Sequence, residues 1–377
     1  MKKWMTVKYK MIYIIVLLVL LTGCKKENTD NGEIITQPAV TVPTETATQE
    51  PIATPIPTVT ESVKPLTVFD YYPLQADTES IYEGSGNEYA AYVQYIDYID
   101  AANNKIQTRT NNGGTETVRV IEIKDGKISI VYIENESYIR ENYMEKDTTG
   151  EAEVLLMEPL VVGTKWTLPD GSERYISETD VAIETPFGSY TALEVTTESS
   201  GSISKDYYAA GVGLVKSVFG EGADEISSSL SAVNQDKPFT QMIDVFFSDA
   251  DEKIYVENRT LTFYTGDDAI KVLQDTLRQK STGSTRLPLI SANTTINSIS
   301  LSKDNIVYID FSAEFVTDMN AGSGYEVLIL QSVVNTLGYF YNSNEVAITL
   351  DGKAYESGHI LLEKGETWEV SETDVVR

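Results

Sequence analysis

Apolar and polar residues alternate in short segments through the middle of the chain. Alternation with a period of two buries one face of a strand and leaves the other in water, so these segments are predicted as strands. They cover residues 118–123, 127–133, 174–183 and 190–196. Asp125-Gly126 accepts the positive φ angles of a tight hairpin turn between the first two. Because no helical pattern of similar strength occurs here, we predict a mostly antiparallel β-rich domain over residues 65–235.

Four tyrosines at intervals of three precede these strands: Tyr89, Tyr92, Tyr95 and Tyr98. They could line the concave face of a curved antiparallel sheet, where such folds hold apolar ligands. The same spacing suits a short amphipathic helix packed on the sheet, and we favour this packing interpretation.

The pattern becomes mixed in residues 238–377, which we predict as a small α+β domain with helices packed on one face of a sheet. Strands are predicted at 242–247, 253–256, 295–301, 305–311 and 346–350, the last being the final strand. One helix is expected after the N-cap acceptors Asp267-Asp268, running to about residue 280, and another from near Ser323. Their buried positions are expected to be Ile270, Leu273 and Leu277 in the first helix, and Val327, Leu330, Val333, Val334 and Leu337 in the second.

Residues 1–23 have the three parts of a signal peptide, with lysines, an apolar run over 11–21 and small residues. The run is about half of the roughly 20 residues that a membrane-spanning helix needs. Its end, Leu21-Thr22-Gly23-Cys24, resembles the bacterial lipobox. This resemblance implies cleavage before Cys24, a diacylglycerol on the Cys24 sulfur, and anchoring on the outer face of the cytoplasmic membrane. The alternative is an ordinary secretory signal in which the cysteine occurs by chance.

Residues 24–64 are predicted as a disordered tether. They contain no aromatic side chain and are rich in Thr, Glu, Gln and Pro, so they cannot bury enough apolar surface to fold. Proline at this density favours extended chain of about 3.1 Å per residue, which gives a reach on the order of 100 Å. The tether either places the folded domains within or beyond a cell wall or only separates them from the bilayer.

Charge and cysteine content exclude several kinds of function. The formal net charge is -28, so the surface is expected to repel nucleic acid. The only cysteine is Cys24, and its lipidation would leave no thiol for a disulfide, a metal site or a nucleophile.

Candidate catalytic chemistry is sparse, and we predict no catalytic residue, metal site or cofactor. The only histidine, His359, follows the last predicted strand and is expected to be a surface or packing residue. Asp249, Asp251 and Glu252 share one loop, but Lys253 occupies the position where a calcium loop needs its next ligand. No phosphate-binding glycine motif is present, and no carboxylate pair stands out as a glycosidase site.

Several short motifs occur in order in the last 140 residues. They are 305–312, Glu314-Phe315, Gly322-Ser323-Gly324, Thr336-Leu337 and the stretch from Val346 to Asp351-Gly352, with Arg259 and Pro288 upstream. Together they resemble the GerM-type (GerMN) domain of sporulation and germination proteins. The Gly-Pro that usually closes the first helix of the family is replaced by Lys280-Ser281-Thr282-Gly283. The resemblance implies a small α/β-layer domain that works through protein contacts in envelope or spore assembly.

These patterns predict a non-enzymatic, membrane-anchored lipoprotein with an assembly or protein-interaction role in the cell envelope, sporulation or germination. Its expected partners are the membrane, through the lipid on Cys24, and envelope or spore-associated proteins. The alternative is a lipoprotein whose β-rich domain binds a lipid, a wall fragment or a peptide. A cavity of several hundred Å³ in that domain would favour the alternative. A wall hydrolase is a third possibility and would need two close carboxylates in a cleft.

Overall fold

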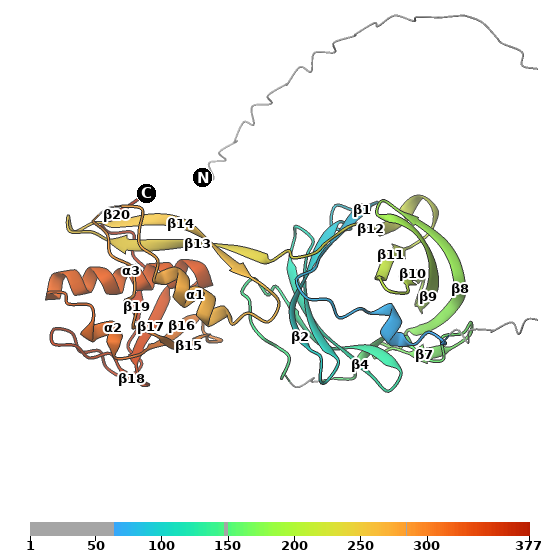
Figure 1. Ribbon diagram of the computed structural model, residues 1–377, viewed down its shortest axis with the longest axis horizontal. Coiled ribbons are helices and arrows are strands. Elements are labelled where there is room, and N and C mark those ends of the chain that lie inside the picture. Colours follow the sequence, from blue (N-terminus) through green and yellow to red (C-terminus); the bar gives the residue numbers. More distant parts are fainter. Residues whose placement is uncertain (1–63, 147–149, 284) are drawn as a thin grey trace, which may run out of the picture. The chain divides into compact units, whose positions relative to one another are not determined.

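The computed structural model describes residues 64–146, 150–283 and 285–377 (Figure 1). The predicted signal peptide, the predicted lipidation site Cys24 and all of the predicted tether except Lys64 lie outside these residues. The described residues belong to one compact unit. No helix in this part of the chain is both long enough and apolar enough to cross a membrane.

A single antiparallel sheet of twelve strands contains the first half of the described chain. Its order is β6-β5-β4-β3-β2-β1-β12-β11-β10-β9-β8-β7, so neighbours in sequence pair by hairpins on both sides of the β1·β12 contact. The strands are β1 (Glu79–Ser85), β2 (Tyr92–Asp100), β3 (Lys105–Asn111), β4 (Glu116–Lys124), β5 (Lys127–Asn135), β6 (Glu153–Met157), β7 (Lys165–Thr167), β8 (Glu173–Thr185), β9 (Gly188–Ser199), β10 (Ser202–Ala209), β11 (Gly213–Phe219) and β12 (Ile226–Asn234).

The predicted strands of this region are confirmed as β4, β5, β8 and β9, each slightly longer than its alternating pattern. The predicted β4–β5 hairpin is confirmed as well. Asp125 and Gly126 have φ angles of 51° and 69°, which are the positive values that a primed two-residue turn requires.

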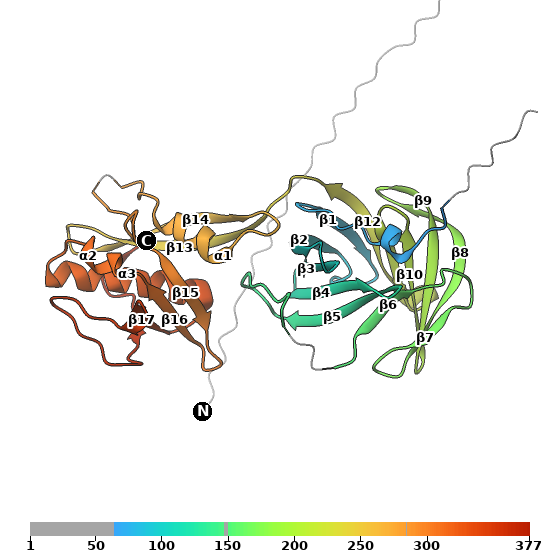
Figure 2. The same cartoon turned by 60° about the horizontal axis from the view of Figure 1, so that its bottom comes forward.

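The twelve-stranded sheet curls until its two end strands come within hydrogen-bonding reach (Figures 1 and 2). Trp166 of β7 donates from Nε1 to the Val154 carbonyl oxygen of β6 at 2.9 Å, and Arg174 of β8 donates to the same oxygen at 2.9 Å. The short 3-10 helix η1 (Val68–Tyr71) contributes the fully buried Val68 to the core inside this curl. The sheet therefore surrounds an interior lined by side chains of many strands.

The helix favoured for the spaced tyrosines is wrong. Tyr92, Tyr95 and Tyr98 belong to strand β2, and the register of β2 against β3 shifts between Ile96 and Tyr98. Pairing with strands on both sides outweighs the helical spacing, because β1 and β3 satisfy the main-chain hydrogen bonds of β2.

The C-terminal half is an α+β fold of two small sheets around a central helix, as the fold class predicted. One sheet has the order β13-β14-β20; the other has the order β15-β16-β17-β18, with β19 also paired to β17. The elements are β13 (Phe239–Ser248), β14 (Ile254–Phe263), α1 (Ala269–Leu277), β15 (Ile296–Leu301), β16 (Ile306–Phe311), α2 (Glu314–Thr317), α3 (Ser323–Tyr341), β17 (Glu345–Leu350), β18 (Lys353–Ala354), β19 (Trp368–Glu369) and β20 (Val375–Val376).

Helix α3 lies between the two sheets and carries much of their shared core (Figure 1). Four of its five predicted core residues, Leu330, Val333, Val334 and Leu337, are fully buried, but Val327 is 43% exposed. The buried stripe is continued by Glu326, one residue earlier, whose carboxylate accepts a 2.7 Å hydrogen bond from the Tyr355 hydroxyl. Glu326 can be buried because its carboxylate has the Tyr355 hydroxyl as a hydrogen-bond donor. It therefore takes the core position that was predicted for Val327.

The remaining C-terminal predictions are largely confirmed. Asp268 caps α1 by accepting from the main-chain nitrogens of Ile270 and Lys271, and the helix ends at Leu277, before the expected residue 280. The strand over 346–350 is not the final one, because the short strands β18, β19 and β20 follow it. Two-residue strands carry no alternating pattern that a sequence could reveal.

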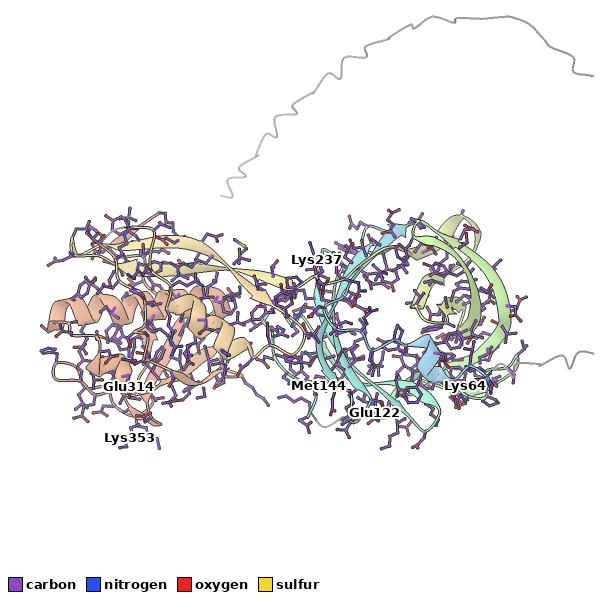
Figure 3. All side chains as sticks on the ribbon, viewed as in Figure 1. Lys64, Glu122, Met144, Lys237, Glu314 and Lys353 are labelled. Carbon is purple, nitrogen blue, oxygen red and sulfur yellow. The ribbon has the colours of Figure 1, made fainter. Side chains whose placement is uncertain are left out.

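The turn between β14 and α1 is bonded to the twelve-stranded sheet. Thr265 donates from its hydroxyl to the Ile96 carbonyl at 2.9 Å, and the Gly266 nitrogen donates to the Asp97 carbonyl at 2.9 Å. Lys237, labelled in Figure 3, lies in the connection between β12 and β13. Its main-chain nitrogen donates to the Asp77 carbonyl at 2.9 Å. Strand β2 thus carries contacts to the C-terminal half on the carbonyls of its central residues.

Candidate ligand-binding cavity

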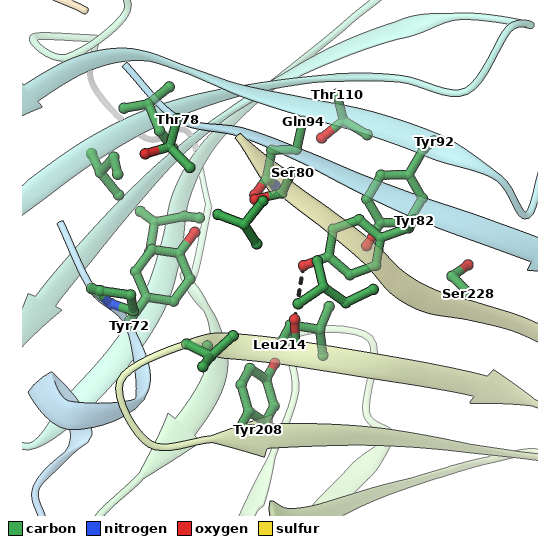
Figure 4. Close-up of a pocket in the computed structure, with 18 of the residues that line it drawn as sticks. Tyr72, Thr78, Ser80, Tyr82, Tyr92, Gln94, Thr110, Tyr208, Leu214 and Ser228 are labelled. Atoms are coloured by element: carbon green, nitrogen blue, oxygen red, sulfur yellow. Dashed lines mark hydrogen bonds between the residues drawn. The ribbon is translucent and has the colours of Figure 1, made fainter. Parts of the chain in front are cut away.

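A cavity of about 730 Å³ lies inside the curl of the twelve-stranded sheet (Figure 4). Ligand pockets in proteins commonly measure about 300 to 1,000 Å³, so this volume is enough for a small organic molecule. The walls come mainly from β1 to β5 and from β10 to β12, and the segment after η1 contributes Tyr72 and Pro73.

Strand alternation selects the side chains that face the cavity. On β2, Tyr92, Gln94 and Ile96 line it, whereas Tyr95 turns to the opposite face and packs its ring 5.4 Å from that of Phe239. Tyr89, in the loop before β2, also lines the cavity. Two of the four spaced tyrosines therefore occupy the place that the ligand interpretation gave them, and the register of the strand directs the others away.

The lining combines three kinds of side chain. Aromatic rings and uncharged polar groups are mixed with a wall of aliphatic residues. The aromatic residues are Tyr72, Tyr82, Tyr89, Tyr92, Phe187 and Tyr208; the uncharged polar ones are Gln75, Thr78, Ser80, Gln94, Thr110, Asn112, Ser228 and Gln235. Apolar pockets with a few directed polar groups are typical of small-molecule sites.

The tyrosines form an ordered wall. The rings of Tyr82 and Tyr92 stack with their centroids 4.3 Å apart, and the Tyr82 hydroxyl donates to the Leu214 carbonyl at 2.8 Å (Figure 4). Burial raises the pKa of Tyr72, Tyr82, Tyr92 and Tyr208 above the ordinary value of a phenol. At neutral pH these four hydroxyls therefore stay protonated, and those of Tyr72, Tyr92 and Tyr208 can donate hydrogen bonds to a ligand.

Among the residues that the structure describes, only two charged side chains line the cavity, Arg119 of β4 and Asp206 of β10. Burial raises the pKa of the Asp206 carboxyl, although the Ser217 hydroxyl donates to it at 2.6 Å and opposes the shift. Protein atoms surround the Asp206 carboxyl, but the side chain is still partly exposed because it lines the cavity.

Exposed aromatic rings mark the rim of the cavity. Tyr89 is 52% exposed in the loop between β1 and β2, and Phe187 is 47% exposed in the turn between β8 and β9, yet both line the cavity. Tyr89 packs over Gly114 in the β3–β4 turn, where a Cβ atom would lie 2.7 Å from its ring. A ligand would meet these rings on entry.

The C-terminal half offers a smaller hollow of about 180 Å³, lined by residues such as Pro288, Phe315 and Tyr325. This volume is below the usual range for ligand pockets. His359 is exposed in the loop after β18. Asp249 accepts from Thr285 at 2.9 Å and pairs with Arg286 at 3.1 Å, so its carboxylate serves local structure. Within the described ranges, no group of three or more potential metal ligands occurs.

The sequence did not reveal Arg119 or Asp206 as site residues. Each is one polar residue at an inward position of an otherwise ordinary strand, and the two residues are 87 positions apart in the chain.

Comparison with known proteins gives a result for the C-terminal half. Residues 244–356 match the Germane family, described as sporulation and spore germination. No match was found among curated proteins.

Three solved structures resemble parts of this chain. The tandem GerMN domains of the sporulation protein GerM from Bacillus subtilis are 21% identical, cover 33% of this chain and 45% of that one, and have a TM-score of 0.26. The first GerMN domain of the same protein is 24% identical over 36% of this chain and 99% of that one, with a TM-score of 0.27. A Bacteroides fragilis protein described as exported, with a YmcC-like fold, is 12% identical over 44% of this chain and 99% of that one, with a TM-score of 0.28.

The chain thus spans less than half of the tandem GerMN structure. The family match includes the motifs 305–312 and 322–324, on which the sequence resemblance depended. Residues 244–356 of this chain form a GerM-type domain of the sporulation and spore germination family.

Proposed function

We propose that this protein is a non-enzymatic, lipid-anchored receptor of the bacterial cell envelope, with folded domains at 65–235 and 238–377. Its β-rich domain binds a small amphipathic molecule, and its GerM-type domain contacts other proteins of the envelope or of the sporulation machinery. The observation that carries the receptor function is the cavity of about 730 Å³ inside the twelve-stranded sheet. The lipobox-like ending at Cys24 supports the anchor, and the family description supports the link to sporulation or germination.

The receptor function is tested with N-phenyl-1-naphthylamine, a neutral apolar probe whose fluorescence rises in dry cavities. The protein is the chain from residue 24 onward with Cys24→Ser, which contains every described residue and carries no lipid. We expect saturable binding of one probe per chain. Gln94→Trp, which places an indole into the cavity, should abolish this binding, since Gln94 lines the wall on β2.

Val93→Trp is the matched control, because the neighbouring residue of β2 does not line the cavity. It should leave probe binding within about twofold of the starting protein, since one residue along a strand reverses the face. Equal binding by the Gln94→Trp protein, or no saturable binding at all, would refute the receptor function.

A role in assembly without a ligand is the second candidate, and the match of residues 244–356 to the Germane family favours it. Crosslinking in growing and sporulating cells, followed by identification of the captured proteins, tests this role. Envelope or spore proteins that are captured equally by the Gln94→Trp and starting proteins would favour assembly alone.

A further inference from the structure

We propose that the ligand is an amphipathic organic anion, whose acidic group pairs with Arg119 and whose apolar part lies along the isoleucine wall of the cavity. This inference rests on the proposed receptor function and names the class of molecule that the receptor takes.

The first step is the pairing state of the arginines. The chain has eight arginines, all in its described part, and seven have a carboxylate oxygen within 4 Å. Arg119 is the exception among the described residues, although the chain carries 57 acidic residues against 29 basic ones. A guanidinium without a carboxylate in a recessed, mostly uncharged site gains most from a charged partner.

Polar groups without partners lie close to Arg119 in the sheet. Thr108 stands directly opposite Arg119 in the β3–β4 pairing, and Thr110 lies two residues further along β3 on the same face. The hydroxyls of both threonines are buried and have no hydrogen-bond partner within the described structure. Of these two threonines, Thr110 lines the cavity and Thr108 does not, so a ligand paired with Arg119 would lie beside Thr110.

The apolar end of the site adjoins the cation. Ile121 follows Arg119 by two residues on the same face of β4, which is about 7 Å along a strand. It pairs with Ile106 on one side and with Ile130 on the other, and all three line the cavity. A molecule with its acidic group at Arg119 can therefore place a hydrocarbon part against this row.

The opposite charge in the cavity does not compete for Arg119. Asp206 lies on β10, across the interior, and accepts its close hydrogen bond from Ser217. No ion pair joins Asp206 to Arg119 among the described residues, so the guanidinium is available to a ligand.

Two probes that share one aromatic frame test the inference. 1-Anilinonaphthalene-8-sulfonate carries a sulfonate, and N-phenyl-1-naphthylamine lacks it. With the Cys24→Ser chain from residue 24, we expect Arg119→Gln to weaken binding of the anionic probe by about tenfold or more, as for loss of a charge-assisted hydrogen bond. Binding of the neutral probe should stay within about threefold, and Arg119→Lys should retain part of the preference for the anion.

Arg377→Gln is the control for loss of one positive charge, since Arg377 pairs with Glu372 and Asp244 and does not line the cavity. It should leave both probes unaffected. Displacement by octanoate, octyl phosphate and octanol then separates a carboxylate from a phosphate ligand, and octanol should compete least. If Arg119→Gln changes neither probe, or weakens both equally, the inference is overturned and the receptor function stands. If neither probe binds the starting protein, both proposals fall.

Discussion

At the scale of single residues, the cavity places ionisable groups where water is scarce, and Asp206 shows the consequence. Its carboxyl is neutralised more readily in the folded chain than in the unfolded chain, because burial disfavours the charged form. A raised pKa of a folded-state carboxyl means that the native state holds its proton more tightly. Its contribution to stability is therefore fully present below the ordinary pKa of 3.8 and is lost as the pH rises through the folded value.

We expect Asp206→Asn to increase the free energy of unfolding at pH 7, because the amide has nearly the same shape, cannot ionise, and can still accept from Ser217. The gain should shrink as the pH falls and vanish below about pH 4. Urea unfolding from pH 3.5 to 7 measures the difference between the two proteins. Asp224→Asn, at an exposed position in the 3-10 helix η2 (Gly222–Asp224), should show no such trend. A difference that is independent of pH would contradict the prediction.

At the scale of secondary-structure elements, helix α1 depends on its N-cap residue, Asp268. The helix has nine residues, so a large share of its main-chain groups lacks partners within the helix. The Asp268 carboxylate satisfies two of them, with a distance of 2.9 Å from the Ile270 nitrogen. The helix contributes Leu273 and Leu277 to the core, and the Asp268 cap helps to hold both residues in place.

Asp268→Ala should therefore destabilise the protein by about 1 kcal/mol, the usual value of a lost N-cap, whereas Asp268→Asn should cost much less. Thermal unfolding of the two variants gives the comparison. Asp275→Ala on the same helix, whose partner Arg278 lies at 3.5 Å on the surface, is the control and should change stability by less than about 0.5 kcal/mol. Equal losses for Asp268→Ala and Asp268→Asn would argue against the capping role.

At the scale of the whole molecule, a buried cluster of charges lies beneath the contacts between β2 and the β14–α1 turn. Asp97 has no exposed side chain and pairs with Arg109 at 3.3 Å and with Arg140 at 3.6 Å. Arg140 also donates to the carbonyls of Tyr264 and Asp267 in that turn. Asp97 thus pairs with two buried guanidinium groups. Arg109 has Glu116 as a second carboxylate partner at 2.8 Å, and Arg140 is the one that holds the turn against the sheet.

Asp97→Ala should lower the free energy of unfolding by about 3 to 5 kcal/mol, because it leaves the charges of Arg109 and Arg140 buried without this partner. Hydrogen exchange should also become faster at the Gly266 amide, whose hydrogen bond to the Asp97 carbonyl of β2 lies at the same site. Asp224→Ala, an exposed position, should have little effect on either measurement. A loss below about 1 kcal/mol would show that the cluster contributes little.

The proposed anchor is a property of the whole chain and is tested in cells. Cys24→Ala should block lipidation, so that the protein accumulates as the uncleaved precursor or appears unlipidated in the medium, because no other thiol in the sequence can receive a diacylglycerol. Cell fractionation with immunoblotting measures the shift, and Cys24→Ala should also abolish labelling by a fatty-acid analogue. Absence of labelling in the starting protein, or a mature size unchanged by Cys24→Ala, would contradict the lipid anchor.

The sequence by itself determined the local elements and the family of residues 244–356. Alternation identified β4, β5, β8 and β9, and Asp125-Gly126 identified the tight turn between β4 and β5. The Asp268 cap identified the start of α1. Each of these features depends on interactions within a few residues. Only the tertiary structure decided that Tyr92 lines a cavity and Tyr95 does not. It also decided that Glu326 replaces Val327 in the core, and that Arg119 and Asp206 line the same cavity. These outcomes depend on strand register, on the curl of twelve strands and on the donor that a carboxylate meets, which are contacts between residues far apart in the chain.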